Sequence, residues 1–180
     1  MRRFALMLAL ALSTAAVLVG SAGSAHSSSS FQVFVDETTS ASATGVTLVS
    51  ELEGTYDVVA KTASGDGTYE VWAGGTELDH GTFALTRLIA FQFYGCGEVT
   101  DEDGNRIELP PDFCGGRALF AIHYTSFTGA EGNASYEVNC QIHDPGGQAP
   151  PGTSEGVKVN ARGVNFNRHV TGDNLFVMLP

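Results

Sequence analysis

TFALTRLIAFQFY, residues 82–94, is the stretch that decides the fold. Apolar side chains alternate in it with small or polar ones, and the apolar row contains Phe83, Leu85, Ile89, Phe91 and Phe93. A period of two residues predicts a β-strand with one buried face. At about 3.3 Å per residue the strand would reach roughly 43 Å, so we expect it to bend at a bulge or to serve two sheets.

Shorter segments rich in β-branched and aromatic residues surround this strand. Clusters of Gly, Pro, Asn and Asp separate them, and none shows a sustained helical period. The segments are residues 31–36, 46–49, 56–61, 68–73, 117–127, 135–142, 156–164 and 174–179. This spacing predicts an all-β fold of about 8–10 mostly antiparallel strands, arranged as a β-sandwich or a β-barrel.

The first 25 residues predict a cleaved signal peptide. Arg2 and Arg3 precede an apolar run of about 16 residues, and small residues follow up to Ala25. The run is short for a membrane span. We therefore expect a secreted, extracellular protein with no membrane attachment after cleavage. A flexible lead-in would cover residues 26–30, and a single domain would cover residues 31–180.

The chain is acidic, with 20 Asp and Glu against nine Lys and Arg and a net charge of −11. Loss of Arg2 and Arg3 with the signal peptide would make it more negative by two. Such a surface repels nucleic acid and anionic membranes, so neither is an expected partner. Nothing in these features indicates an oligomeric state.

Three cysteines permit one intrachain disulfide. Cys96 follows the long strand and Cys114 precedes the segment at residues 117–127, so antiparallel pairing of these two segments would place them opposite each other. A Cys96–Cys114 bridge would stabilise the fold by roughly 3 kcal/mol. Cys140 shares its face with apolar neighbours, and we expect it to be a buried free thiol.

This pairing has a consequence for the register. With Cys96 opposite Cys114, Arg87 falls opposite His123 and Ile89 falls opposite Ala121. The more apolar face of the second strand is nevertheless the other one. Either a bulge shifts the register, or both faces are partly covered.

Three residues are candidates for ligand binding: Trp72, Arg87 and His123. Trp72 lies on the polar side of its strand, where an exposed ring would stack on a sugar; alternatively it packs against a second layer. Arg87 interrupts an apolar row, so it either enters a ligand cavity, forms an ion pair, or is turned outward by a bulge.

Two further motifs are assigned to turns or loops. Ser154 lies in a G-x-S-x-G match, but two prolines precede it and a strand follows, so a nucleophile elbow is not expected. Asp101 and Asp103 belong to a strong turn signal, with a surface calcium ion as the alternative. Asn133 begins a glycosylation sequon, which matters only in a eukaryotic source.

The sequence predicts no catalytic residue, cofactor or metal site. His80, His123, His143 and His169 are scattered without ligand spacing, and no Cys/His zinc motif occurs. The leading hypothesis is a secreted, non-catalytic binding protein for a carbohydrate or a small apolar ligand. The alternatives are a secreted enzyme with a site assembled around Arg87 and His123, and a structural or surface protein without a small ligand.

Overall fold

The computed structural model describes residues 29–100, 105–142 and 154–180. The predicted signal peptide, Asp101, Asp103 and His143 lie outside the described residues. No helix occurs in these ranges, and hence no helix that is long and apolar enough to cross a membrane.

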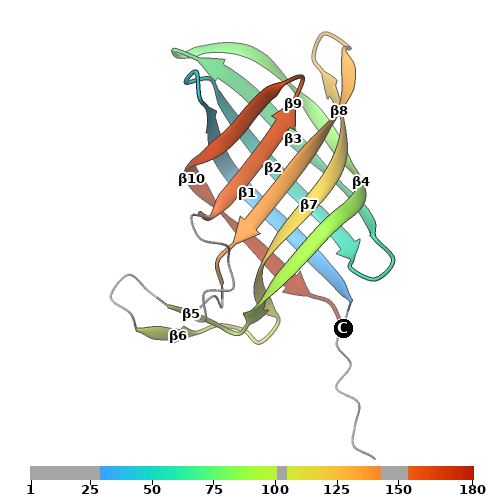
Figure 1. The fold of residues 1–180 in the computed structure, drawn as a ribbon, viewed down its shortest axis with the longest axis vertical. Helices are drawn as coiled ribbons and strands as arrows, with labels where there is room; N and C mark the ends of the chain where they lie inside the picture. The colour runs from blue at the N-terminus through green and yellow to red at the C-terminus, as the bar shows by residue number, and fades with distance from the viewer. Residues whose placement is uncertain (1–28, 101–104, 143–153) are drawn as a thin grey trace, which may run out of the picture.

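Ten strands make up the fold (Figure 1). They are β1 (Ser30–Ser42), β2 (Thr47–Asp57), β3 (Thr62–Ala73), β4 (Thr76–Cys96), β5 (Glu98–Thr100), β6 (Arg106–Glu108), β7 (Phe113–Ser126), β8 (Glu131–Cys140), β9 (Gly156–Ala161) and β10 (Val164–Met178). Eight of them close an antiparallel barrel in the order β1-β10-β9-β8-β7-β4-β3-β2, and β5 and β6 form a separate hairpin. The all-β prediction is confirmed, and the structure is a barrel rather than a sandwich.

The long strand β4 pairs with β3 on one side and β7 on the other, and it bends at bulges. Its register with β7 shifts three times, so Arg87 lies opposite Ala121 while Cys96 still lies opposite Cys114. The bulges turn Leu88 into the barrel and leave Ile89 39% exposed. The expectation that Ile89 belongs to the buried row is therefore wrong, because each inserted residue reverses the alternation. Of the two alternatives for the register, the bulge is the one found, and it moves Arg87 away from the position opposite His123.

The cysteine predictions are confirmed. Cys96 and Cys114 form a disulfide, and the β5–β6 hairpin lies within the loop that it closes. Cys140 is a buried free thiol. Burial raises the pKa of Cys140 to about 12, so it is protonated and acts as a small apolar core residue.

The two ends of the barrel differ in how they are filled. At one end, the lower end in Figure 1, five aromatic rings meet with centroids 5.1 to 5.8 Å apart. This aromatic end consists of Phe31, Tyr56, Phe91, Phe120 and Phe176. An eight-stranded barrel is just wide enough for side chains to fill it, and here they do. The opposite end, called the cavity end below, is hollow.

Candidate ligand cavity at one end of the barrel

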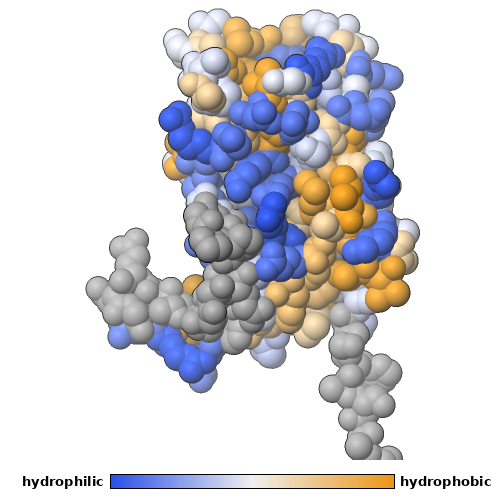
Figure 2. Space-filling view, viewed as in Figure 1, coloured by the Kyte–Doolittle hydropathy of each residue, from blue (hydrophilic) through white to orange (hydrophobic). Residues whose placement is uncertain are grey.

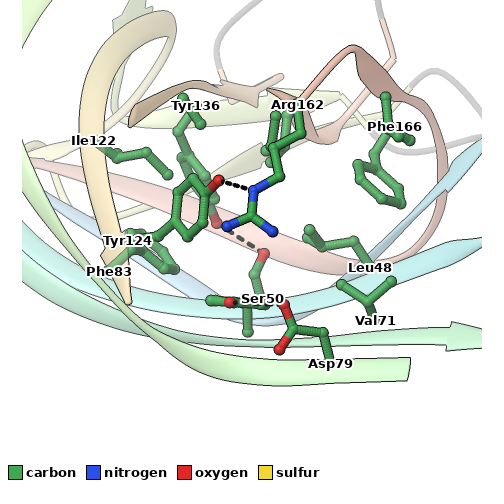
Figure 3. A pocket seen from close by; sticks show the side chains of 15 residues that line it. Leu48, Ser50, Val71, Asp79, Phe83, Ile122, Tyr124, Tyr136, Arg162 and Phe166 are labelled. Carbon is green, nitrogen blue, oxygen red and sulfur yellow. Dashed lines mark hydrogen bonds between the residues drawn. The ribbon is translucent and has the colours of Figure 1, made fainter. Parts of the chain in front are cut away.

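A cavity of about 180 Å³ lies inside the cavity end, between the starts of β2, β4, β8 and β10 and the ends of β3, β7 and β9 (Figure 3). Its lining residues are mostly apolar or aromatic. They are Leu48, Ser50, Tyr69, Val71, Asp79, Phe83, Ile122, Tyr124, Ala134, Tyr136, Val159, Ala161, Arg162, Val164 and Phe166. Strand alternation explains most of this wall, because inward positions two residues apart face the same space.

Small side chains explain why this end is hollow. Ala134 of β8, Ala161 of β9 and Ser50 of β2 occupy inward positions at the level of the cavity. In the filled part of the core the same three strands hold larger residues, Val138 on β8, Val157 on β9 and Tyr56 on β2. The volume left by the missing side-chain atoms is the cavity.

Two hydroxyl groups form a hydrogen bond at the base of the cavity. The Oγ of Ser50 and the Oη of Tyr136 lie 2.9 Å apart, and both residues are buried. Burial raises the pKa of Tyr136 above its ordinary value, so its hydroxyl stays protonated. The pair satisfies two polar groups that would be costly to bury alone.

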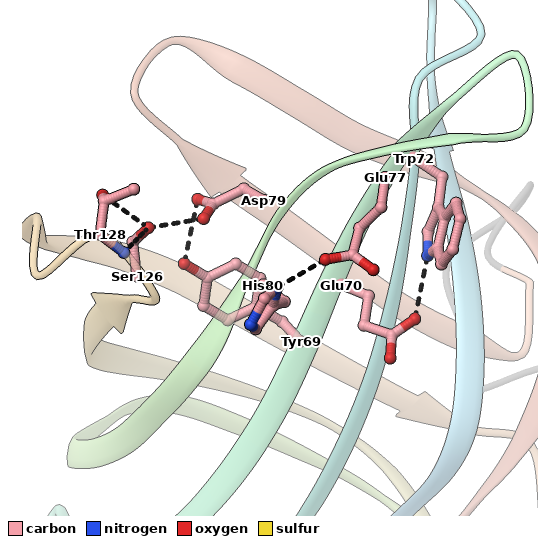
Figure 4. A network of polar contacts seen from close by, with 8 residues as sticks. All are labelled: Tyr69, Glu70, Trp72, Glu77, Asp79, His80, Ser126 and Thr128. Carbon is pink, nitrogen blue, oxygen red and sulfur yellow. Dashed lines mark hydrogen bonds and ion pairs between the residues drawn. The ribbon is translucent and has the colours of Figure 1, made fainter.

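Asp79 of β4 brings a carboxylate to the cavity wall. Its Oδ1 accepts a hydrogen bond from the Ser126 hydroxyl at 2.5 Å, and its Oδ2 accepts one from the Tyr69 hydroxyl at 3.2 Å (Figure 4). Burial, followed by the neighbouring Asp79 charge, raises the pKa of Tyr69 to about 12. Tyr69 therefore acts as a hydrogen-bond donor that holds the carboxylate in place.

Arg162 reaches over the cavity from the turn between β9 and β10 (Figure 3). Its Nε donates a hydrogen bond of 2.6 Å to the Oη of Tyr124, and its guanidinium carbon lies 5.3 Å from the centre of the same ring. A side chain at position 132 would clash with Tyr124, because a Cβ on Gly132 would lie only 2.4 Å from the Tyr124 hydroxyl oxygen. The absence of a side chain at Gly132 thus gives the tyrosine room to reach the arginine.

Arg162 is one of three non-glycine residues with a positive φ in the described ranges, together with Glu37 and Lys61. Arg162 and Gly163 have φ values of 49° and 78°, the left-handed pair of a two-residue hairpin turn. Asn, Asp or Gly suit the first of these positions better than Arg, because the left-handed region costs a side chain of ordinary size about 1 kcal/mol or more. The segment predicted over residues 156–164 is thus two strands joined by this turn.

The three ligand-binding candidates from the sequence lie apart from the cavity lining. Trp72 is half-buried on the polar side of β3, where its indole nitrogen donates to Glu70 at 3.0 Å (Figure 4). Arg87 is exposed at a bulge of β4. The His123 ring on β7 lies 3.1 Å from the Asn133 amide oxygen. The structure does not bring these three residues together, and their role in binding stays a prediction.

The loop residue Ser154 has no strand–turn–helix setting. It is exposed ahead of β9, and its carbonyl oxygen accepts a hydrogen bond from Asn139 at 2.8 Å. Within residues 29–100, 105–142 and 154–180, no group of three or more His, Cys, Asp or Glu side chains is placed to hold a metal ion.

On the face of the barrel shown in Figure 2, polar residues are interspersed with apolar areas. Exposed apolar residues on β4 include Ile89 and Phe93, at 39% and 45% exposure. Neither residue lines the cavity, and the Phe93 ring lies 6.0 Å from the buried Phe31 ring at the edge of the aromatic end.

Sequence reasoning missed the cavity residues. The alternation of residues 68–73 and 117–127 did indicate that Tyr69 and Tyr124 share a face with apolar neighbours. A further signal was Arg-Gly at positions 162 and 163 between two alternating segments, which is a hairpin signal with an unusual first residue.

Comparison of the chain with known protein families, with curated proteins and with solved structures finds no match.

Proposed function

We propose that this protein is a secreted, non-catalytic binding protein that takes a small, largely apolar ligand into the cavity end of the barrel. The observation that supports this most directly is the cavity of about 180 Å³ with its apolar and aromatic wall. An engineered apolar cavity of about 150 Å³ binds benzene. The expected ligand is therefore about one ring in size, with a short substituent at the mouth.

The polar groups of the cavity favour such a ligand over a carbohydrate. Ser50 and Tyr136 bond to each other, and Tyr69 and Ser126 both donate to Asp79. A sugar would bury several hydroxyls against this wall, and each unpaired one would cost free energy. The apolar part of a ligand has no hydrogen bonds with water to lose on entering the cavity, and it gains contact with the apolar wall.

Two observations favour binding over catalysis. Arg87 and His123, the proposed centre of an enzyme site, are not cavity residues. Inside the cavity, the carboxylate and the hydroxyls are engaged with one another in hydrogen bonds. These hydrogen bonds give the carboxylate and the hydroxyls a structural role in the cavity wall, which favours binding over catalysis.

Secretion is part of the proposal. The predicted signal peptide is its main support, and the Cys96–Cys114 disulfide fits an oxidising compartment. N-terminal sequencing of the exported protein is expected to find a start between residues 23 and 30. A mature protein that begins at Met1 would contradict secretion by cleavage.

Toluene is a suitable neutral probe for the cavity. Titration into the exported protein with labelled methyl groups should give saturable NMR shifts at Ile122, Val71 and Val159, which line the cavity. Methyl glucoside should leave these methyl signals unchanged. Absence of saturable shifts with toluene, or shifts only at exterior methyl groups, would overturn the proposal. Shifts at Trp72 with methyl glucoside would favour the carbohydrate alternative.

A further inference from the structure

We propose that Arg162 makes the cavity selective for small monocarboxylic acids, whose apolar body enters the barrel while the carboxylate binds the guanidinium at the mouth. This inference rests on the binding function proposed above and names the class of ligand. It joins two observations: the direction of the Arg162 side chain and the distribution of charge around the cavity.

The conformation of Arg162 is compatible with a role in binding but does not establish one. A φ of 49° places it in the left-handed region at the first position of a two-residue turn, where Asn or Gly would be less strained. Strained residues cluster at functional sites, yet Glu37 and Lys61 share this conformation and do not line the cavity. The direction of the Arg162 side chain and the charges around it therefore carry the argument.

The orientation of the side chain is fixed by Tyr124. The Nε donates to the tyrosine hydroxyl at 2.6 Å, and the ring lies beneath the guanidinium. The two Nη groups remain on the side that faces the cavity (Figure 3). Among the described residues, no Asp or Glu oxygen lies within the 4.0 Å of an ion pair with Arg162.

The chemistry of this arrangement suits a carboxylate. A guanidinium is a planar fork of donors that matches the two oxygens of a carboxylate, and the pair is charge-assisted. Below the fork the wall is apolar, with Phe83, Ile122 and Val159 facing the cavity. A ligand with one anionic end and one apolar end meets both surfaces at once.

The uncharged inner wall determines which way such a ligand enters. Asp79 lies near the start of β4 and bonds to Ser126, the last residue of β7, so its carboxylate stands at the same open end as Arg162. Of the lining residues that the structure describes, only Asp79 and Arg162 are charged. A carboxylate placed deeper in the cavity would lose its hydration without gaining a charged partner. The acid end therefore stays with Arg162 at the mouth, and the apolar end is directed inward.

Phenylacetate and phenylacetamide test this inference, because they share shape and differ in charge. Isothermal titration calorimetry should show that the wild-type protein binds phenylacetate roughly ten- to hundredfold more tightly, the scale of one charge-assisted hydrogen-bonded contact. In Arg162→Gln the two ligands should bind with equal affinity. Arg162→Lys should retain part of the preference, because it keeps the charge without the planar fork.

Arg168→Gln is the matched control. It removes the same charge from an exposed position of β10 that does not line the cavity. Its preference for phenylacetate should equal that of the wild type. Far-UV circular dichroism and the melting temperature establish that each variant is folded, and toluene binding establishes that its cavity is intact.

Each outcome has a distinct meaning. Equal binding of acid and amide by the wild type, or toluene binding without either, overturns the acid selectivity and leaves the apolar binding function standing. Loss of the preference in Arg168→Gln would also overturn it. Tighter binding of phenyl phosphate than of phenylacetate would overturn the assignment to carboxylates. Absence of binding of all four compounds overturns the binding function itself.

Discussion

The aromatic end and the cavity end of the barrel are built from the same strands and yet differ in packing. β4 and β7 supply an aromatic ring to both ends, so they do not account for the difference. The difference lies on β2, β8 and β9, which carry Ser50, Ala134 and Ala161 at the cavity end and the larger Tyr56, Val138 and Val157 in the filled part of the core. Side-chain volume at these inward positions thus decides whether a stretch of barrel is solid core or binding space.

The two ends also treat buried hydroxyls differently. At the cavity end Tyr136 shares a hydrogen bond with Ser50. At the aromatic end the hydroxyl of Tyr56 is buried without a hydrogen-bond partner among the described residues, and burial raises its pKa well above the ordinary range. The aromatic end accepts that cost because the ring fills its space. The cavity end has its polar groups paired and its volume open, as a binding site requires.

Truncation of a ring should have the largest effect, and it should be larger at the aromatic end. Phe120→Ala is expected to lower the free energy of unfolding by about 3–5 kcal/mol, because its ring packs on Tyr56 in a filled core. Phe83→Ala should cost less, because one side of its ring already faces empty space. Urea unfolding at equilibrium measures both. Equal costs would mean that the two ends are packed alike.

A carboxyl group near the aromatic end should make stability depend on pH. Glu155 accepts hydrogen bonds from the Gln141 backbone at 2.6 Å and from Asn174 at 3.3 Å, and burial raises its pKa from 4.5 to about 7. The folded state holds this proton more tightly than the unfolded state. Stability from this group is therefore present below pH 4.5 and lost as the pH rises to about 7, by at most roughly 3 kcal/mol.

Glu155→Gln is the control for this prediction, because it keeps the shape and removes the titration. Urea unfolding between pH 4.5 and 7.5 should show a smaller decline in stability for Glu155→Gln than for the wild type. Parallel curves for the two proteins would show that Glu155 titrates alike in the folded and unfolded states.

Filling the hollow should remove binding while preserving the fold. Ala134→Phe places a ring in the cavity and is expected to weaken toluene binding by at least about tenfold, since ligand and ring compete for one space. Ala121→Phe adds the same ring on the outward face of β7 and should bind toluene normally. Titration calorimetry measures both affinities. Normal binding by Ala134→Phe would place the site elsewhere.

The smallest expected effect concerns the two tyrosine hydroxyls. Tyr56→Phe removes an unpaired buried hydroxyl, so stability should stay the same or rise by up to about 1 kcal/mol. Tyr136→Phe removes a partner from Ser50 and should lower stability by about 1 kcal/mol. Urea unfolding at equilibrium measures the change in the free energy of unfolding for both variants. A loss in Tyr56→Phe as large as in Tyr136→Phe would show that Tyr56 has a partner too.

Local patterns in the sequence predicted a good part of the fold. The all-β class, the Cys96–Cys114 bridge and the burial of Cys140 all follow from alternation within one strand and from neighbouring strands in the chain. Each of these features depends on residues close in sequence or on one pairing of consecutive long strands. The pattern failed at Ile89, since bulges in β4 reverse which residues point inward.

Such local patterns could not predict the candidate site. Ala134 and Ala161 look like ordinary strand residues in the sequence, and the Arg-Gly pair at positions 162 and 163 indicates at most a turn, with nothing to connect it to a cavity. Only the closed barrel places them beside Ser50 and Tyr124.

The sequence by itself determined that this chain forms strands, which cysteines pair, and that polar residues alternate with apolar ones. These are properties of single strands and of adjacent pairs, so they are encoded locally. The tertiary structure decided which end is filled and which is hollow. That depends on the summed volume of side chains from non-adjacent strands at one level of the barrel, and on bulges that set which of them point inward.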